Sequence, residues 1–223
     1  DVCSVVLSNE NEEWIKKEKK EGRSHATTLA VYIREALAEA GISASQLDAV
    51  SVSMGPGSYT GLRIGVSAAK GICYGADIPL IAVSTLKSMA SGMIGRLKMH
   101  NAQVKNMFFL PMIDARRMEV YTAVFSAGLK PVSEVQALVI GADSFHDLAI
   151  EKELILFGTG AEKLQDILTD KRITIETGFT ISASYMIPLG LEKFRNAVFE
   201  DVAYFEPYYL KDFITTTSKK KML

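Results

Sequence analysis

The chain has 223 residues, of which 48% are apolar and 23% are charged, the profile of an ordinary globular protein. This composition excludes an intrinsically disordered chain, a collagen-like repeat and a disulfide scaffold. The 25 basic and 26 acidic side chains give a net charge of −1. There is therefore no domain-wide basic field that would hold a nucleic acid unaided.

The cysteine content and the apolar runs favour a cytoplasmic protein. Cys3 and Cys73 are far apart and belong to no CxxC pair, so we expect reduced thiols rather than a disulfide or a zinc ribbon. No apolar run approaches the roughly 20 residues of a membrane span, and we see no signal peptide. Because the chain begins at Asp1 and at once forms a predicted strand, we expect an earlier piece of the native protein to be missing.

The first half of the chain alternates strands and helices. Residues 2–7 and 12–17 predict a β-hairpin around the turn at 9–11. Apolar residues at helical spacing predict a helix over 26–40, which Gly41 ends. The elements predicted next are a strand over 48–54, a helix over 60–74, a strand over 79–83 and a helix over 85–97.

After His100 and Asn101 strands predominate. We predict long strands over 104–113 and 120–125, joined by the turn 114–117. Further strands near 135–140 and 154–157 are each followed by a short helix, and residues 182–198 predict a last helix. The chain closes on the basic tail Ser218-Lys219-Lys220-Lys221, for which a solvated tail or a weak attraction to phosphate are the two interpretations.

This alternation predicts an α/β protein with two related lobes. We place the N-terminal lobe at residues 1–100 and the C-terminal lobe at 101–223, because the pattern changes near residue 100. The C-terminal helix and tail are expected to pack back on the first lobe.

The segment GPGSYTGLR, at 55–63, is the most specific motif in the chain. It follows a predicted strand and opens a helix, where free backbone N–H groups can hold an anion. It is neither a Walker A loop nor GxGxxG. Two interpretations stay open: a tight structural turn in which Thr60 caps the helix, or a ligand cradle. The weak candidates for cofactor binding are Gly55, Gly57, Ser58, Tyr59 and Thr60.

Other chemistry has little support in the sequence. The histidines His25, His100 and His146 are isolated, with no HxxxH or HExxH pair, so we expect no metal site. No GxSxG elbow marks a nucleophile. Asp114, beside Arg116 and Arg117, could hold a ligand or magnesium, although a turn aspartate is the simpler interpretation.

The helix at 60–74 has more apolar surface than one core contact requires. At 100° per residue, Leu62, Val66, Ala69 and Cys73 form one apolar face, and Arg63, Ser67, Lys70 and Tyr74 form a polar stripe. Much of the remainder consists of Ile64, Ala68, Ile72 and glycines. Either both sides are internal, or one side is a partner surface.

Together these motifs resemble the TsaB (YeaZ) family, the dimerisation subunit of the machinery that places threonylcarbamoyl on adenosine in tRNA. The resemblance runs over most of the chain. The segments that carry it are GRSHATTL at 22–29, VSMGPGSYTGLRIGVSAAKG at 52–71, PLIAVSTL at 79–86, DARRMEVY at 114–121, FGTGA at 157–161 and EPYYLK at 206–211.

The resemblance implies a two-lobed fold of the actin, hexokinase and Hsp70-like (ASKHA) superfamily, here incomplete at its N-terminal part. Family members open with a strand and a short Thr/Ser turn, and this sequence begins after that point. Whether a nucleotide site exists is therefore left open. The resemblance also implies a non-catalytic scaffold without a cofactor of its own.

The implied partners are a TsaD-type catalytic subunit and a TsaE-type ATPase, with a homodimer when the chain is alone and tRNA reached only through the complex. The alternative is an enzyme of the same fold, either an M22-type glycoprotease-like peptidase or an ATP-using transferase. A helical partner surface is expected on the helices at 26–40 and 60–74. Its candidate residues are Tyr32, Leu62, Ile64, Gly65, Ala68 and Ile72.

Overall fold

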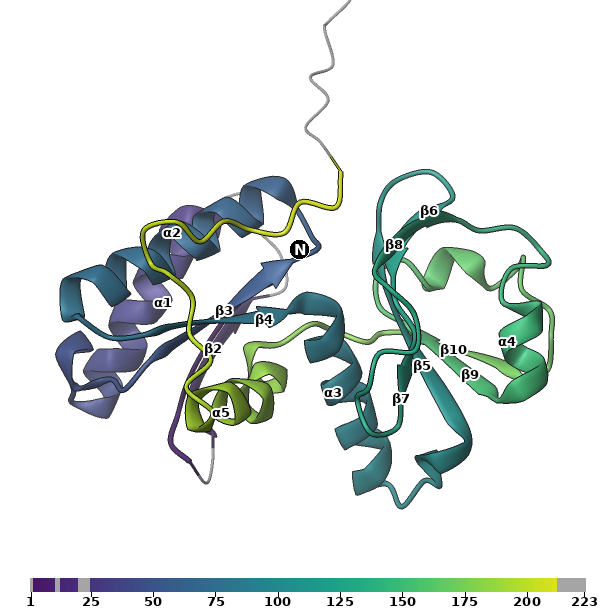
Figure 1. The fold of residues 1–223 in the computed structure, drawn as a ribbon, viewed down its shortest axis with the longest axis horizontal. Helices are drawn as coiled ribbons and strands as arrows, with labels where there is room; N and C mark the ends of the chain where they lie inside the picture. Colours follow the sequence, from purple (N-terminus) through teal and green to yellow (C-terminus); the bar gives the residue numbers. More distant parts are fainter. Residues whose placement is uncertain (1, 11–12, 20–24, 212–223) are drawn as a thin grey trace, which may run out of the picture.

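The computed structural model describes residues 2–10, 13–19 and 25–211, and the basic tail at 218–221 lies outside them. The described chain forms an α/β fold of two lobes that lie side by side (Figure 1). Within the described residues, no helix is long and apolar enough to cross a membrane.

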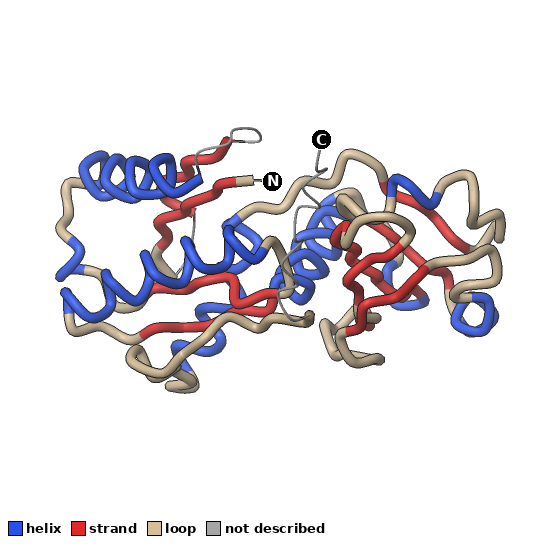
Figure 2. The backbone as a smooth tube through the Cα atoms, turned by 90° about the horizontal axis from the view of Figure 1, so that it is seen from above, coloured by secondary structure: helices blue, strands red, loops and turns tan. Residues whose placement is uncertain are grey.

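The first lobe contains two separate pairs of strands. The predicted hairpin is confirmed: β1 (Cys3–Ser8) and β2 (Glu13–Lys19) pair in antiparallel fashion. Strand β3 (Val50–Gly55) pairs in parallel with β4 (Leu80–Ser84). The helix α1 (His25–Ala40) packs on the hairpin, and α2 (Tyr59–Ala76) packs on β3. In Figure 2 the hairpin lies beside α1, set apart from the β3–β4 pair.

The second lobe is built on one mixed sheet with the order β10-β9-β5-β6-β8. Strands β9 and β10 run parallel to β5, whereas β6 and β8 are antiparallel to their neighbours, and the short β7 pairs with β5. The bounds are β5 Met107–Asp114, β6 Glu119–Thr122, β7 Phe125–Ser126, β8 Gln136–Val139, α4 His146–Glu151, β9 Glu153–Phe157 and β10 Ile173–Glu176.

Two helices each pack against the lobe formed mainly by the other half of the chain. The helix α3 (Thr85–Met99) buries Met89 and Met93 against Phe109 and Phe157, so it covers one face of the second-lobe sheet. The helix α5 (Ile187–Arg195) comes from the second half of the chain but packs on β4, where Leu189 joins the core of the first lobe. Successive residues of a strand face opposite sides, so the other sheet face has a core of its own, built around Leu110, Val120, Leu156 and Leu164.

The structure differs from the sequence prediction in four places. The strand predicted to start at 104 begins at Met107, after a 3-10 turn, and the strand predicted over 120–125 is divided into β6 and β7. The helix predicted over 182–198 is a 3-10 turn followed by α5, because Pro188 lacks an N–H and suits only a first helical turn. Strand β10 was not predicted, since four residues are too few for a clear period.

Candidate functional site

The GPGSYTG motif forms the connection from β3 to α2. Ser58 caps α2, its hydroxyl accepting a hydrogen bond from the Gly61 N–H at 3.4 Å, so the expectation that Thr60 is the cap is wrong. Ser58 lies two residues before Thr60, immediately ahead of the helix, so its hydroxyl can accept from the free N–H groups of the first turn. Gly55 has a φ of +119°, a backbone conformation that residues other than glycine rarely adopt.

The segment 200–211, which we name the C-terminal strap, runs back over α2 and the end of β3 (Figure 1). Its Glu200 N–H donates to the Leu80 carbonyl at 2.9 Å, and its Tyr208 N–H donates to the Met54 carbonyl at 2.7 Å. Lys70, on α2, donates to the strap carbonyls of Ala203 and Phe205, both at 3.0 Å. The strap therefore takes part in the hydrogen bonding of both strands of the β3–β4 pair.

Side chains of the GPGSYTGLR motif hold the end of the strap. The rings of Tyr59 and Tyr209 lie 4.5 Å apart, and the Arg63 guanidinium stacks over the Tyr59 ring at 4.2 Å. The Arg63 Nε donates to the Tyr209 hydroxyl at 3.3 Å. A further lysine of the strap, Lys211, pairs with Glu119 of β6 at 2.5 Å and so ties the strap to the second lobe.

These contacts account for two residues of the polar stripe of α2, because Arg63 and Lys70 both bind the strap, whereas Tyr74 is exposed. They also bring together two motifs, GPGSYTGLR and EPYYLK, that are about 150 residues apart in the sequence. Of the weak cofactor candidates, Gly55 and Tyr59 contact the strap, whereas Ser58 caps the helix. Gly57 and Thr60 lie beside them, and a ligand cradle at this turn stays a prediction.

A largely apolar cavity of about 890 Å³ lies mostly in the first lobe, and Ile113 and Thr159 of the second lobe also line it. It lies between β1 and β3 and is covered by α1 and α2 on one side and by residues of α5 on another. Among the described residues, β1 pairs with β2 alone and β3 with β4 alone, so both strands have an unpaired edge. The residues of α1 and α2 that line this cavity include Leu29, Ile33, Leu37, Ile64, Ala68 and Ile72.

The structure separates the six candidate interface residues into groups. Leu62 is only 8% exposed, so its side chain packs within the lobe and has little surface left for a partner. A Cβ on Gly65 would meet Val52 at 3.8 Å, so this glycine faces β3. Ile64, Ala68 and Ile72 are half-buried along the cavity, and Tyr32 is half-buried outside its lining.

The DARR segment forms a tight turn between β5 and β6. Asp114 accepts a hydrogen bond from the Arg116 N–H at 3.1 Å, and Arg116 and Arg117 both adopt left-handed backbone conformations. Lys163 reaches this turn from the second half of the chain, where it pairs with Asp114 and donates to the carbonyls of Arg117 and Glu119 at 2.7 and 2.8 Å. Asp114 therefore serves the turn.

Replacing Lys163 by methionine is expected to lower the free energy of unfolding by about 1–3 kcal/mol, because two carbonyls and a carboxylate lose their shared donor. Urea unfolding measures the change. Lys171→Met, at an exposed lysine, is the control and should change stability by less than about 0.5 kcal/mol. Equal effects of the two substitutions would show that Lys163 does not support the turn.

Both cysteines are buried and free, and burial raises the pKa of each thiol. Within the ranges that the structure describes, no three His, Cys, Asp or Glu side chains lie close enough to hold a metal ion.

The two lobes, with α3 covering the second-lobe sheet and α5 returning to β4, define an α/β protein of the ASKHA-like class. The solved structure of YeaZ from Pseudomonas aeruginosa superposes with a TM-score of 0.76 over 94% of both chains, at 22% sequence identity.

Sequence comparison identifies the family. The family model of TsaD, tRNA N6-adenosine threonylcarbamoyltransferase, matches residues 6–212. The Escherichia coli tRNA threonylcarbamoyladenosine biosynthesis protein TsaB is 29% identical over 85% of this chain and 82% of its own length. The Haemophilus influenzae TsaB is 37% identical over 54% of this chain and 48% of its own length. The chain belongs to this family, on its TsaB (YeaZ) branch.

Proposed function

We propose that this chain is a subunit of the machinery that makes threonylcarbamoyladenosine in tRNA. The observation that carries the proposal is its similarity to the Escherichia coli TsaB protein over 85% of the chain, together with the family model that matches 6–212. In this proposal the chain is a non-catalytic scaffold of the cytoplasm. It pairs with a TsaD-type catalytic subunit, which a TsaE-type ATPase joins, and it meets tRNA only through the complex.

The partner surface in this proposal is the outer side of α1 and α2. At 100° per residue, Gly71 and Gly75 fall on the side of α2 opposite its buried face, and Ala38 lies similarly on α1. Gly71, Gly75 and Ala38 are exposed. Small residues let a second pair of helices approach closely, so the same surface suits a homodimer when the chain is alone.

Reconstitution tests the function. The chain is co-expressed with the TsaD-type protein of the same cell, purified through a tag on one partner, and added with the TsaE-type protein, ATP and the substrates to unmodified tRNA. We expect a stable complex, and nucleoside analysis by mass spectrometry should detect threonylcarbamoyladenosine only when all the subunits are present. Full modification without this chain would refute the proposal. Modification or proteolysis by this chain alone would favour an enzyme instead.

A further inference from the structure

The first-lobe cavity, of about 890 Å³, has the outline of a β-strand. Consecutive residues of both bordering strands line it, from Val2 to Glu10 along β1 and from Asp48 to Ser53 along β3. Successive side chains of a strand point to opposite faces, so a cavity on one face would be lined by every second residue. A lining of consecutive residues means that this cavity lies in the plane of the strands, along their edges.

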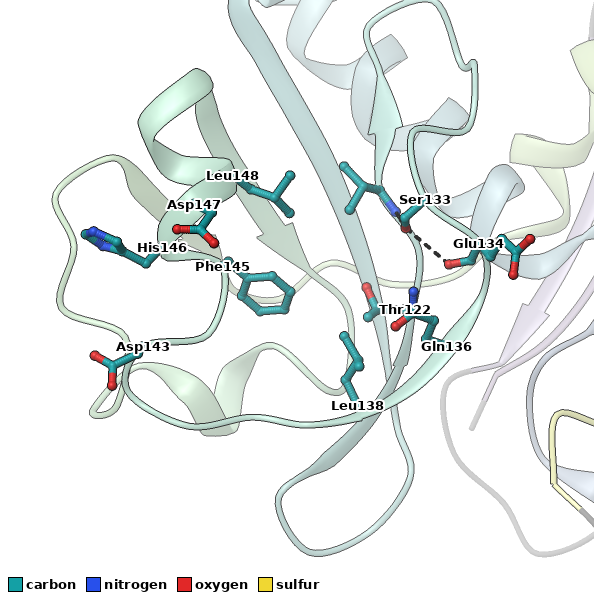
Figure 3. Close-up of a pocket in the computed structure, with 11 residues that line it drawn as sticks. Thr122, Ser133, Glu134, Gln136, Leu138, Asp143, Phe145, His146, Asp147 and Leu148 are labelled. Atoms are coloured by element: carbon teal, nitrogen blue, oxygen red, sulfur yellow. Dashed lines mark hydrogen bonds between the residues drawn. The ribbon is translucent and has the colours of Figure 1, made fainter.

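A pocket of about 600 Å³ in the second lobe shows the contrast (Figure 3). Thr122 Oγ1 is an orphan hydroxyl there, buried without a hydrogen-bond partner among the residues that the structure describes. The lining takes every second residue of two neighbouring segments, Thr122 and Val124 on one and Gln136 and Leu138 on the other. That pocket therefore lies on one face of its sheet, and only the first-lobe cavity lies between strand edges.

The edges that border the first-lobe cavity carry backbone groups that can pair with a further strand. Among the described residues, β1 pairs with β2 alone and β3 with β4 alone. The Val50 N–H donates to the Pro79 carbonyl, just ahead of β4, at 3.0 Å. Because the backbone groups of successive residues point to alternate sides of a strand, those of Ser51 and Ser53 point away from β4, toward the cavity.

Helices cover the cavity on both faces. In Figure 1, α2 and α5 lie on opposite sides of the β3–β4 pair. The lining from α1 and α2 includes Ile33, Leu37 and Ala68, and the lining from α5 includes Ile187 and Leu191. A strand that is buried on both faces is a nearly continuous apolar run. The cavity therefore selects an extended segment of about six mainly apolar residues, the length of β1 and β3.

The two bordering strands run in opposite directions. In Figures 1 and 2 the mark for the start of the chain lies near the end of β3 from which α2 begins. A strand between β1 and β3 is thus antiparallel to one and parallel to the other. Antiparallel neighbours are joined by a turn of about two to five residues, whereas parallel neighbours need a crossover of about a dozen or more. The shortest connection is a hairpin turn into the start of β1.

We propose that the polypeptide directly ahead of Asp1 in the native protein inserts into this cavity as a β-strand. It pairs with β1 in antiparallel and with β3 in parallel fashion, so the two strand pairs become one five-stranded sheet with the added strand at its centre. Because α1 and α2 both line the cavity, the added strand also fixes how these two helices are spaced. The assignment goes beyond the proposed function and does not depend on it.

Amide hydrogen exchange tests the added strand. The chain of 223 residues is compared with a product extended by the residues that its gene encodes ahead of Asp1. We expect the Ser51 and Ser53 amides to exchange at least ten-fold more slowly in the extended product, relative to the Val50 amide, which already donates to Pro79 and is the control.

Three outcomes would overturn the proposal. The first is an equal exchange ratio in the two products. The second is a gene that encodes fewer than about five residues ahead of Asp1, too few for a strand of this length. The third is protection of Ser51 and Ser53 only after another protein is added, because the strand would then come from a partner.

Two substitutions in the extended product test the site without the shorter chain. Ala68→Trp places an indole where the added strand lies, so it should lower the melting temperature by about 5 °C or more. Ser67, its neighbour on α2, is exposed, so Ser67→Trp should lower it by less than about 2 °C. In an unfilled cavity the indole has room, so an effect of Ala68→Trp no larger than that of Ser67→Trp would contradict the added strand.

Discussion

Replacing Gly55 by alanine is expected to lower the free energy of unfolding by about 3 kcal/mol or more. Two causes add. The φ of +119° is strained for any residue with a Cβ, and that Cβ would lie 2.5 Å from the Tyr208 carbonyl oxygen. Because Tyr208 lies on the strap, the clash can be relieved only by moving the strap away from β3 or by distorting the turn.

The neighbouring glycine supplies the control. A Cβ on Gly57 would meet only Leu62, at 3.9 Å, and its φ is not in the left-handed region, so Gly57→Ala should change stability by less than about 1 kcal/mol. Urea unfolding gives both values. Hydrogen exchange should also show faster exchange of the Tyr208 amide in Gly55→Ala. Similar stabilities of the two variants would mean that the strap does not depend on the turn.

A glutamate at position 71 is expected to break partner binding while leaving the fold intact. Gly71 is exposed in the middle of α2, and a Cβ there would meet nothing within 4 Å. Glycine is a poor helix former, so Gly71→Glu should keep or slightly raise the melting temperature. If α1 and α2 face a partner, the buried charge should weaken association by about 2 kcal/mol or more, roughly thirty-fold.

Gly95→Glu is a closely matched control, because Gly95 is also an exposed glycine inside a helix, α3, with nothing within 4 Å of a Cβ. Light scattering and co-purification with the TsaD-type protein measure association, and circular dichroism measures the fold. If the Gly71→Glu variant associates as strongly as the Gly95→Glu variant, the partner surface lies elsewhere. Ile72→Glu adds a third comparison: its side chain lines the cavity, so we expect loss of stability as well as of association.

The elements of the first lobe could be predicted closely from the sequence, and those of the second lobe less well. The helices α1 and α2 were expected within one or two residues, because long amphipathic runs are strong local signals and Gly41 marks the end of α1. The expectation that Gly75 ends the second helix is wrong, since α2 continues to Ala76 and Asp77 caps it in a left-handed conformation. Short elements such as β7 and β10 have too few residues for a period, and they exist because a neighbouring strand supplies their hydrogen bonds. Leu62 shows the same limit, since periodicity cannot say which of two apolar faces is turned inward.

The sequence by itself determined the alternation of strands and helices, the family, and the presence of a polar stripe and surplus apolar faces on α2. These follow from local spacing and composition, which act within a few residues along the chain.

Only the tertiary structure decided what those faces meet. Arg63 and Lys70 of the stripe bind a strap that comes from residues 200–211, and the side with Ala68 and Ile72 lines a cavity beside β1. The orphan hydroxyl of Thr122 likewise appears only once β6, β8 and α4 come together. Contacts between distant segments depend on how the layers pack, and no local pattern encodes that packing.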